Sequence, residues 1–310
     1  MISCYASDNG KLHKIDAPQP GCWVNIVSPC ETELVEMERV LGVDPSMLRA
    51  ALDAEETSHI DLEDDQKLVI VDVPIAEEDD DSQKTIVYST LPVGLIIMAD
   101  YFITVSLKET SAFQDLAEGR VRNLSPAQKT KFALQILLRV ANRYLYYLKQ
   151  VDKISHSVEK QLHKSMKNKE LFQLLELEKS LVYFTTSLQS NSITIKKILA
   201  GRVMPLYDED QDLLEDVMIE VNQAIEMSTI YSSILSGMMD AFASVISNNL
   251  NIVMKVLTSV TILLTIPNVI FSFYGMNVEN LPVPTSWFAA GVAVVITVTA
   301  GIILKKKDLI

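Results

Sequence analysis

The chain has 310 residues, 48% of them apolar, and a formal net charge of −13 at pH 7. That length allows one or two folded domains besides a membrane segment. The acidic balance argues against a nucleic-acid-binding protein, because phosphate recognition needs an extended basic face, whereas cationic partners or a surface that only serves solubility both remain compatible with it.

Residues 1–124 are predicted to form an α/β domain. The expected helices cover 31–41 and 45–54, and runs of β-branched and apolar residues predict strands at 67–73, 85–91 and 95–106. The first fourteen residues hold no long apolar run, so no cleavable signal peptide is expected. Cys4, Cys22 and Cys30 include no CxxC pair and predict reduced thiols rather than a zinc site or a disulfide framework.

An acidic run lies between two of the predicted strands and consists of Glu77, Glu78, Asp79, Asp80 and Asp81. Carboxylate oxygens are the ligands that hard divalent cations prefer. A charged run is also an ordinary feature of a solvated turn, so a metal site and a plain surface loop are both possible interpretations here.

Residues 125–207 are predicted to form a long antiparallel helical hairpin. Ser125 and Pro126 are typical of a helix start. The apolar positions of the first helix keep heptad spacing: Leu137, Val140, Tyr144, Tyr147, Val151, Ile154, Val158 and Leu162. Lys167-Asn168-Lys169 predicts the turn, and the second helix is expected to run over 171–199, until Gly201 and Pro205 end it.

Residues 208–273 predict one continuous helix. No proline occurs between Pro205 and Pro267, and only Gly237 interrupts the helical pattern. At 1.5 Å per residue such a helix would be about 100 Å long. Its last third, 252–273, has a single charge, Lys255, and is long enough to cross a bilayer.

A second predicted span covers 286–304, which carries no charge. Lysines lie at the start of the first span and in the tail 305–310, while the loop 274–285 has none, so the positive-inside rule places both ends of the hairpin in the cytoplasm. Tyr274 and Trp287 fall where interfacial aromatic residues are expected. The sequence therefore predicts a multi-pass protein of the cell membrane with most of its mass in the cytoplasm.

Polar residues and one methionine recur in the first span at spacings of four and three: Met254, Thr258, Thr261, Thr265, Asn268 and Ser272. Such a stripe predicts a water-filled lining shared by several copies of the helix, because lipid cannot hydrogen-bond these groups. The alternative is that the side chains join helices or bond back to their own backbone. Pro267 adds a kink and frees a carbonyl at the same depth.

The first span ends in Tyr274-Gly275-Met276-Asn277, followed by Glu279 in a short loop. A Gly-Met-Asn at the outer end of the penultimate helix, before a basic carboxy terminus, resembles the CorA family of magnesium transporters. The resemblance implies a ring of Asn277 amides that binds the waters of hydrated Mg²⁺, with Gly275 at a tight turn that Tyr274 and Met276 brace. It gives Glu279 a role in concentrating cations, although an ordinary exposed loop acid is an equal interpretation.

The resemblance extends down the same helix. It implies that Asn251, Met254 and Leu257 form the cytoplasmic pore mouth and a hydrophobic constriction, and that Thr265 and Asn268 lie at mid-pore positions. Asp216 falls at the stalk position where the family carries an acid that meets an acidic loop of the neighbouring subunit, which here would be 77–81, and Asp240 lies higher on the stalk. The candidate metal-binding residues are therefore Asp79, Asp80, Asp81, Asp216 and Asp240.

The expected fold is therefore an α+β cytoplasmic domain with a long-helix stalk and a two-helix transmembrane hairpin, assembled as a CorA-like, funnel-shaped homopentamer. The implied function is passive, channel-like Mg²⁺ transport that intracellular Mg²⁺ bound between subunits closes, without enzymatic activity. Two alternatives remain: a Zn²⁺, Co²⁺ or Ni²⁺ transporter of the same superfamily, and a membrane-tethered coiled-coil scaffold. Expected partners are other copies of the chain, membrane lipid and divalent cations, and no nucleic acid.

Overall fold

The computed structural model describes residues 1–8, 10–63, 65–78, 86–119, 121, 123–165, 168–201, 203–277, 282–283, 285–307 and 309, without the side chains at 78, 163–165 and 168. The chain divides into two compact units, Met1–Gly237 and Met238–Ile310. Helix α6 (Asp208–Tyr274) contributes residues to both units.

The first unit is built on a sheet in the order β2-β1-β3-β7-β6-β5-β4. Its strands are β1 (Ile2–Asp8), β2 (Lys11–Ile15), β3 (Trp23–Val27), β4 (Ile60–Glu63), β5 (Gln66–Glu78), β6 (Ile86–Ile97) and β7 (Phe102–Ser106). β3 and β7 pair in parallel, and the other neighbours pair antiparallel. Every residue of β7 is buried, as expected of a strand covered on both faces.

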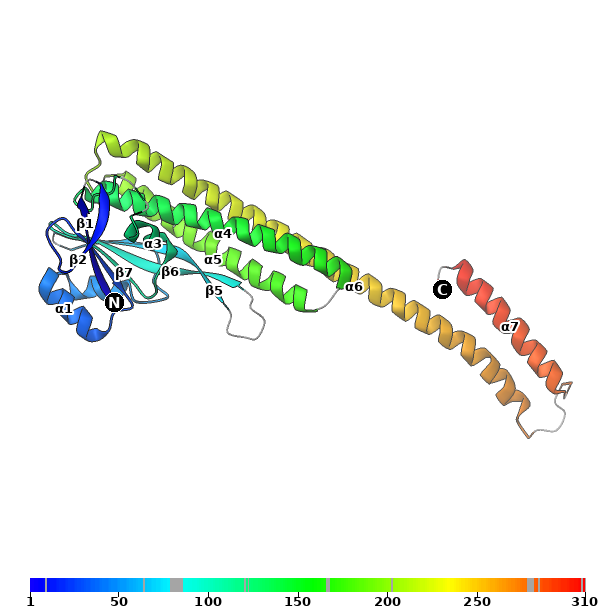
Figure 1. Ribbon diagram of the computed structural model, residues 1–310. Helices are drawn as coiled ribbons and strands as arrows, with labels where there is room; N and C mark the ends of the chain where they lie inside the picture. Colours follow the sequence, from blue (N-terminus) through cyan, green and yellow to red (C-terminus); the bar gives the residue numbers. More distant parts are fainter. Residues whose placement is uncertain are drawn as a thin grey trace. The chain divides into compact units, whose positions relative to one another are not determined.

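Helices cover both faces of this sheet (Figure 1). Helices α1 (Glu31–Leu41) and α2 (Pro45–Ala50) pack with one apolar cluster, and α3 (Ser111–Ala117), α4 (Lys129–Ser165), α5 (Asn168–Leu199) and the first part of α6 share the other. Gly94 of β6 lets α2 approach closely, because a Cβ atom at Gly94 would lie 2.6 Å from the Cβ of Ala51. The α/β arrangement predicted for this region is confirmed.

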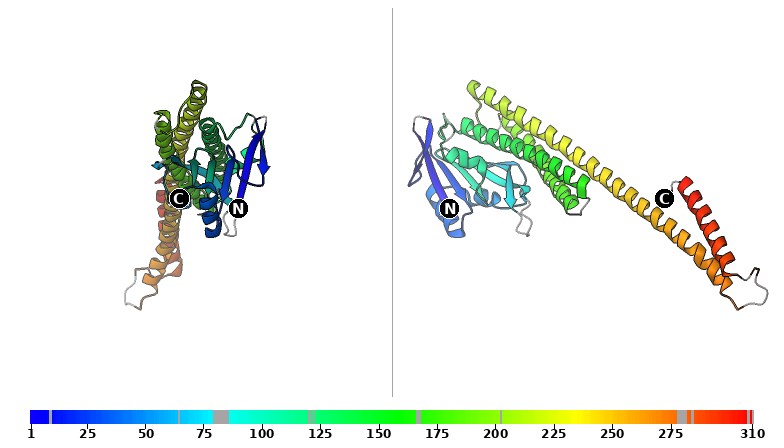
Figure 2. Two further views of the ribbon diagram at one scale, coloured as in Figure 1. Left: turned by 90° about the vertical axis from the view of Figure 1, so that its left-hand side faces the viewer. Right: turned by 45° about the vertical axis from the view of Figure 1, so that its right-hand side comes forward.

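The predicted helical hairpin corresponds to α4 and α5, which run in opposite directions side by side (Figure 2). The heptad positions predicted from Leu137 to Leu162 are all buried or half-buried. α5 ends at Leu199, and Gly201 follows with a φ of 69°. The predicted start was wrong: α4 begins at Lys129, because Ser125 accepts a bond from the Gln128 N–H and forms a separate turn first.

The predicted strand break near Pro92 was also wrong, because β6 continues from Ile86 to Ile97 and the break falls at 98–101. Pro92 does not interrupt the strand, because it lies opposite Asp72 of β5, whose N–H and C=O point to the other edge of β5, as those of Ile70 do toward Ser58 and His59. On that edge Asn191 of α5 binds the Asp72 backbone: its amide donates to the Asp72 carbonyl at 2.8 Å and accepts from the Asp72 N–H at 2.9 Å. The Tyr144 hydroxyl also donates to this carbonyl at 3.0 Å.

The Asp72 side chain is buried next to these hydrogen bonds. Burial raises the pKa of its carboxyl to about 6, and a hydrogen bond from Ser187 lowers this pKa by a smaller amount. Its unfolded pKa is about 3.9, so the folded protein binds the proton more tightly and loses about 3 kcal/mol of stability as the pH rises from 4 through 6. We expect Asp72→Asn to raise the melting temperature at pH 7.5, with the gain disappearing near pH 4. Thermal melts across this range test it, and the same substitution at exposed Asp100 should change nothing; a gain that is independent of pH would contradict the assignment.

The second unit consists of the last part of α6 and of α7 (Ser286–Lys306), which runs back along it. Among the described residues, these are the two helices that are long and apolar enough to cross a membrane. α7 turns a face of small residues to α6, where Ala289 and Ala293 are buried and a Cβ atom at Gly301 would lie 3.8 Å from Leu263. The Ser259 hydroxyl donates to the Leu309 carbonyl at 2.8 Å.

Candidate functional site

A continuous polar stripe runs along the part of α6 that belongs to the second unit. It contains the predicted positions and two serines that the sequence analysis missed: Asp240, Ser244, Ser247, Asn251, Met254, Thr258, Thr261, Thr265, Asn268 and Ser272. All ten are exposed in the single chain, and each is three or four residues from the next. Ser244 and Ser247 could have been found from the same spacing, because they join Asp240 to Asn251 without a gap. Leu257 is also exposed, at 58%, and lies beside the stripe.

The stripe faces away from α7. The residues of α6 that α7 covers are buried Ser259 and half-buried Leu263, Ile266, Ile270 and Tyr274. At 3.6 residues per turn, this covered face lies about half a turn from Met254 and Thr265. Most of the polar side of α6 is therefore left open by the hairpin, while Thr261 and Thr265 also border a groove of about 430 Å³ that Ile296 of α7 lines.

Two hydroxyls in the stripe bond to their own helix. The Thr261 hydroxyl donates to the Leu257 carbonyl at 2.8 Å, and the Thr265 hydroxyl donates to the Thr261 carbonyl at 2.7 Å. This is the back-bonding alternative raised from the sequence. It uses only the donor of each hydroxyl, so both oxygens can still accept a hydrogen bond from water.

The motif Tyr274-Gly275-Met276-Asn277 lies where α6 ends. The Gly275 N–H donates to the Phe271 carbonyl at 2.9 Å, and a Cβ atom at Gly275 would lie 3.2 Å from that oxygen. The Tyr274 hydroxyl donates to the Pro282 carbonyl at 3.1 Å and so joins the two ends of the outer loop. Met276 and Asn277 are exposed. Glu279 lies outside the described residues.

The predicted metal-binding acids are distributed over both units. Asp216 and Asp240 are exposed on α6, and no hydrogen bond or ion pair of either carboxylate occurs within the described part of the chain. Asp79, Asp80 and Asp81 lie outside that part. Where the structure does describe side chains, it brings no three His, Cys, Asp or Glu residues together in a way that could hold a metal ion.

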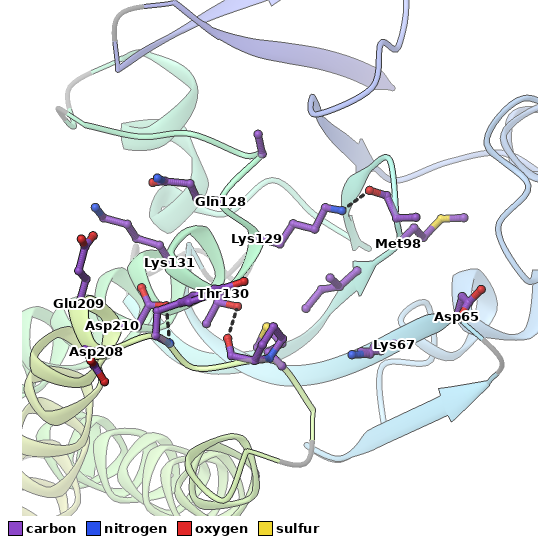
Figure 3. A pocket seen from close by; sticks show the side chains of 16 residues that line it. Asp65, Lys67, Met98, Gln128, Lys129, Thr130, Lys131, Asp208, Glu209 and Asp210 are labelled. Atoms are coloured by element: carbon purple, nitrogen blue, oxygen red, sulfur yellow. Dashed lines mark hydrogen bonds between the residues drawn. The ribbon is translucent and has the colours of Figure 1, made fainter.

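A cavity of about 1020 Å³ lies in the first unit, where α4 and α6 begin near the ends of β5 and β6 (Figure 3). Lysines and acids line it together, and several are already engaged: Lys129 donates to the Ala99 carbonyl, and the Asp210 carboxylate accepts from the Tyr207 N–H at 3.4 Å. The Thr130 hydroxyl donates to the Pro205 carbonyl at 3.0 Å. None of the predicted site residues lines this cavity.

Comparison with known sequences gives two matches. The sequence profile of the CorA-like Mg²⁺ transporter protein family matches residues 19–306. A curated relative, the cobalt/magnesium transport protein CorA of Methanocaldococcus jannaschii, is 27% identical over 288 residues, which are 88% of this chain and 86% of that protein.

Comparison with solved structures shows the same fold. The complete CorA magnesium transporter from Methanocaldococcus jannaschii has a TM-score of 0.85 at 23% identity and covers 100% of this chain and 99% of its own. The full-length CmaX protein has a TM-score of 0.71 at 12% identity, covering 99% and 97%. The ZntB cytoplasmic domain from Vibrio parahaemolyticus has a TM-score of 0.60 at 13% identity, covering 80% and 97%.

Proposed function

The chain belongs to the CorA-like Mg²⁺ transporter family, and on that premise we propose that it forms a homopentameric channel that carries Mg²⁺ passively into the cell, with both termini in the cytoplasm. Five copies of α6 would surround one axis and turn their polar stripes toward it. The observation that carries this proposal is the orientation of the stripe, which lies opposite the face that α7 covers. In lipid, the polar members of the stripe within the span, from Thr258 to Ser272, would leave hydrogen-bonding groups without partners.

The two ends of the stripe would have different tasks. At the outer end, Asn277 follows α6 directly, and a ring of its amide oxygens could accept hydrogen bonds from the waters of the hydrated ion. This suits Mg²⁺, which gives up its water reluctantly. At the inner end, Met254 and Leu257 are exposed apolar side chains next to Asn251, and rings of them could close the path by excluding water.

Regulation would use acids from more than one subunit. The carboxylate of Asp216 is exposed on α6, and the chain's own described acids assemble no site around it. Oxygen ligands are the right chemistry for Mg²⁺, and the missing ones could come from the 77–81 run of a neighbouring copy. Asp240, which lies closer to the membrane span on the same helix, would add a second ring of carboxylates. Ions bound between subunits would hold the pore closed, and their loss would let the carboxylates repel one another.

The transported ions would include Co²⁺ as well as Mg²⁺, because the curated relative is named for both. The proposed filter would contact hydrated ions through neutral amides, so it would admit both ions, in a ratio that depends on where the amide oxygens lie. Uptake of Mg²⁺ in competition with Co²⁺, Ni²⁺ and Zn²⁺ measures the preference. A membrane-tethered scaffold would have no use for a polar stripe that faces away from its hairpin partner, which makes this second function the weaker proposal.

Cysteine labelling tests the wet lining directly. In a Cys30→Ser background, whose remaining thiols Cys4 and Cys22 are buried, we expect a charged, membrane-impermeant thiol reagent to block Mg²⁺ uptake into liposomes by Thr258→Cys. The matched control is Val260→Cys, which is exposed on α6 but off the stripe. It should keep its uptake because lipid excludes the reagent. Equal block of both variants, or of neither, would contradict the proposed pore.

A further inference from the structure

Pro267 leaves one backbone carbonyl of α6 without its usual hydrogen-bond donor. It lies within α6, which continues to Tyr274. Because proline has no N–H, it cannot donate to the carbonyl of Leu263 one turn earlier. Leu263 and Pro267 are both half-buried on the side of α6 that α7 covers. The carbonyl without its usual donor therefore lies on the α7 side of the helix, where a side chain of α7 can supply the missing bond.

Thr297 of α7 has a polar atom in need of a partner at this interface. It follows Ala289 and Ala293 at four-residue spacing and precedes Gly301 by four, so it lies on the face of α7 that packs against α6. Its hydroxyl oxygen is buried and makes no hydrogen bond to any described residue. An unpaired hydroxyl in such surroundings costs about 1–3 kcal/mol.

The other threonine within α7 behaves differently. The Thr299 hydroxyl donates to the Val295 carbonyl of its own helix at 2.7 Å. Back-bonding of this kind is the usual solution for threonine in a membrane helix. Thr297 does not use it, so its hydroxyl remains available for a group on α6.

The two groups lie at the same depth. Gly301 is next to Leu263, and nearer the outer end the ring of Phe288 lies 6.5 Å from that of Tyr274. In an α-helix each carbonyl points toward the next turn, so the Leu263 carbonyl points outward along α6. α7 runs the opposite way, and one turn outward from Gly301 is Thr297. A groove of about 430 Å³ is lined by Ile296 of α7 and by Ile266 and Ile270 of α6, so this turn of α7 lies beside this turn of α6.

The single chain does not form this bond, and we infer that in the membrane a small rotation of the Thr297 side chain lets its hydroxyl donate a hydrogen bond to the Leu263 carbonyl, which holds α6 to α7 at the turn where Pro267 removes the helix's own donor. Thr297 is then a positioning residue. The segment of α6 beyond Pro267 leads directly into Asn277, so the bond fixes where that amide lies. The bond itself is independent of transport, whereas its effect on ion selection rests on the proposed function.

A double-substitution cycle on the full-length protein in lipid nanodiscs tests the bond without any transport assay. We expect Thr297→Val, which keeps the shape of the side chain and removes the hydroxyl, to lower the melting temperature by a few degrees. In a Pro267→Ala background the Leu263 carbonyl regains its helical donor, so the same change should have little effect. Thr297→Ser should behave as wild type. Thr299→Val is the matched control and should shift neither background. A higher melting temperature for Thr297→Val, or equal shifts in both backgrounds, would overturn the inference.

Ion selection supplies the second measurement. We expect Thr297→Val to change the ratio of Mg²⁺ to Co²⁺ uptake into liposomes several-fold, and Thr297→Ser to restore the wild-type ratio, whereas Thr299→Val leaves it unchanged. An unchanged ratio in Thr297→Val would reject the positioning role even if the cycle demonstrates the bond. If the wild-type protein carries no divalent ion at all, the proposed function fails, and the thermal cycle still decides whether the bond exists.

Discussion

Asn277→Ala is expected to reduce Mg²⁺ uptake into liposomes by about a hundredfold or more, because a ring of five amides would lose a net hydrogen bond of about 0.5–1.5 kcal/mol from each copy. The side chain lies just beyond the end of α6 and is exposed, so its removal leaves no cavity in the fold. The loss should therefore appear in the rate of transport and not in protein stability. Initial uptake rates and thermal melts of the same preparation measure the two separately.

The control for this change is Asn248→Ala. Asn248 is an exposed asparagine of the same helix that lies off the polar stripe, and its removal should leave the rate of uptake close to wild type. Uptake that survives in Asn277→Ala at the wild-type rate would remove the amide ring from the mechanism. Equal losses in both variants would point to a general effect of shortening asparagine.

Asp216→Ala is expected to weaken closure of the pore by intracellular Mg²⁺. Each copy would lose one carboxylate ligand of a site between subunits, and we expect the Mg²⁺ concentration needed for half-maximal closure to rise about tenfold or more, within the usual range of coupling energies. Uptake should accordingly continue at Mg²⁺ concentrations that stop the wild-type protein. Flux measured against a series of internal Mg²⁺ concentrations gives the closure curve.

Asp212→Ala is the matched control, because Asp212 is an exposed acid one turn earlier on the same helix. Its closure curve should overlay that of the wild type. If Asp216→Ala and wild type close at the same concentration, Asp216 is an ordinary surface acid and the regulatory ion must bind elsewhere. A charge effect on the whole stalk would instead shift both variants equally.

Local patterns were sufficient to predict the long helices of the fold. The heptad spacing from Leu137 to Leu162 specifies a buried helix face, and the uncharged run before Tyr274 specifies a membrane span, because each depends on residues close in sequence. Ser244 and Ser247 also fit the three- and four-residue spacing of the stripe, and they were overlooked only because they precede the apolar span.

Two features that escaped prediction depend on residues distant in sequence. Pro92 is normally a sign that a strand ends, and it does not end β6 because it pairs with Asp72 at a point where the backbone groups of β5 face away from β6. Those groups are bound instead by Asn191, 119 positions beyond Asp72. Likewise, Pro267 could be recognised from sequence as a residue that frees a carbonyl, but only the packing of α7 shows that the hydroxyl of Thr297 is buried and has no partner among the described residues. A hydrophobic pattern does not encode such polar pairs.

The alternation of three- and four-residue steps in the stripe has a geometric consequence. Met254 repeats Asp240 after two heptads, and Asn268 repeats Met254 after two more. A strict repeat of 3.5 residues per turn stays on one side of a helix only if neighbouring helices wind around each other with a left-handed twist, since a straight helix drifts by about 20° per heptad. Straightening the bundle would thus rotate the outer end of the stripe, at Ser272, by about a quarter turn around α6 relative to Asp240. Winding and unwinding could change what the ion meets without any helix leaving its place.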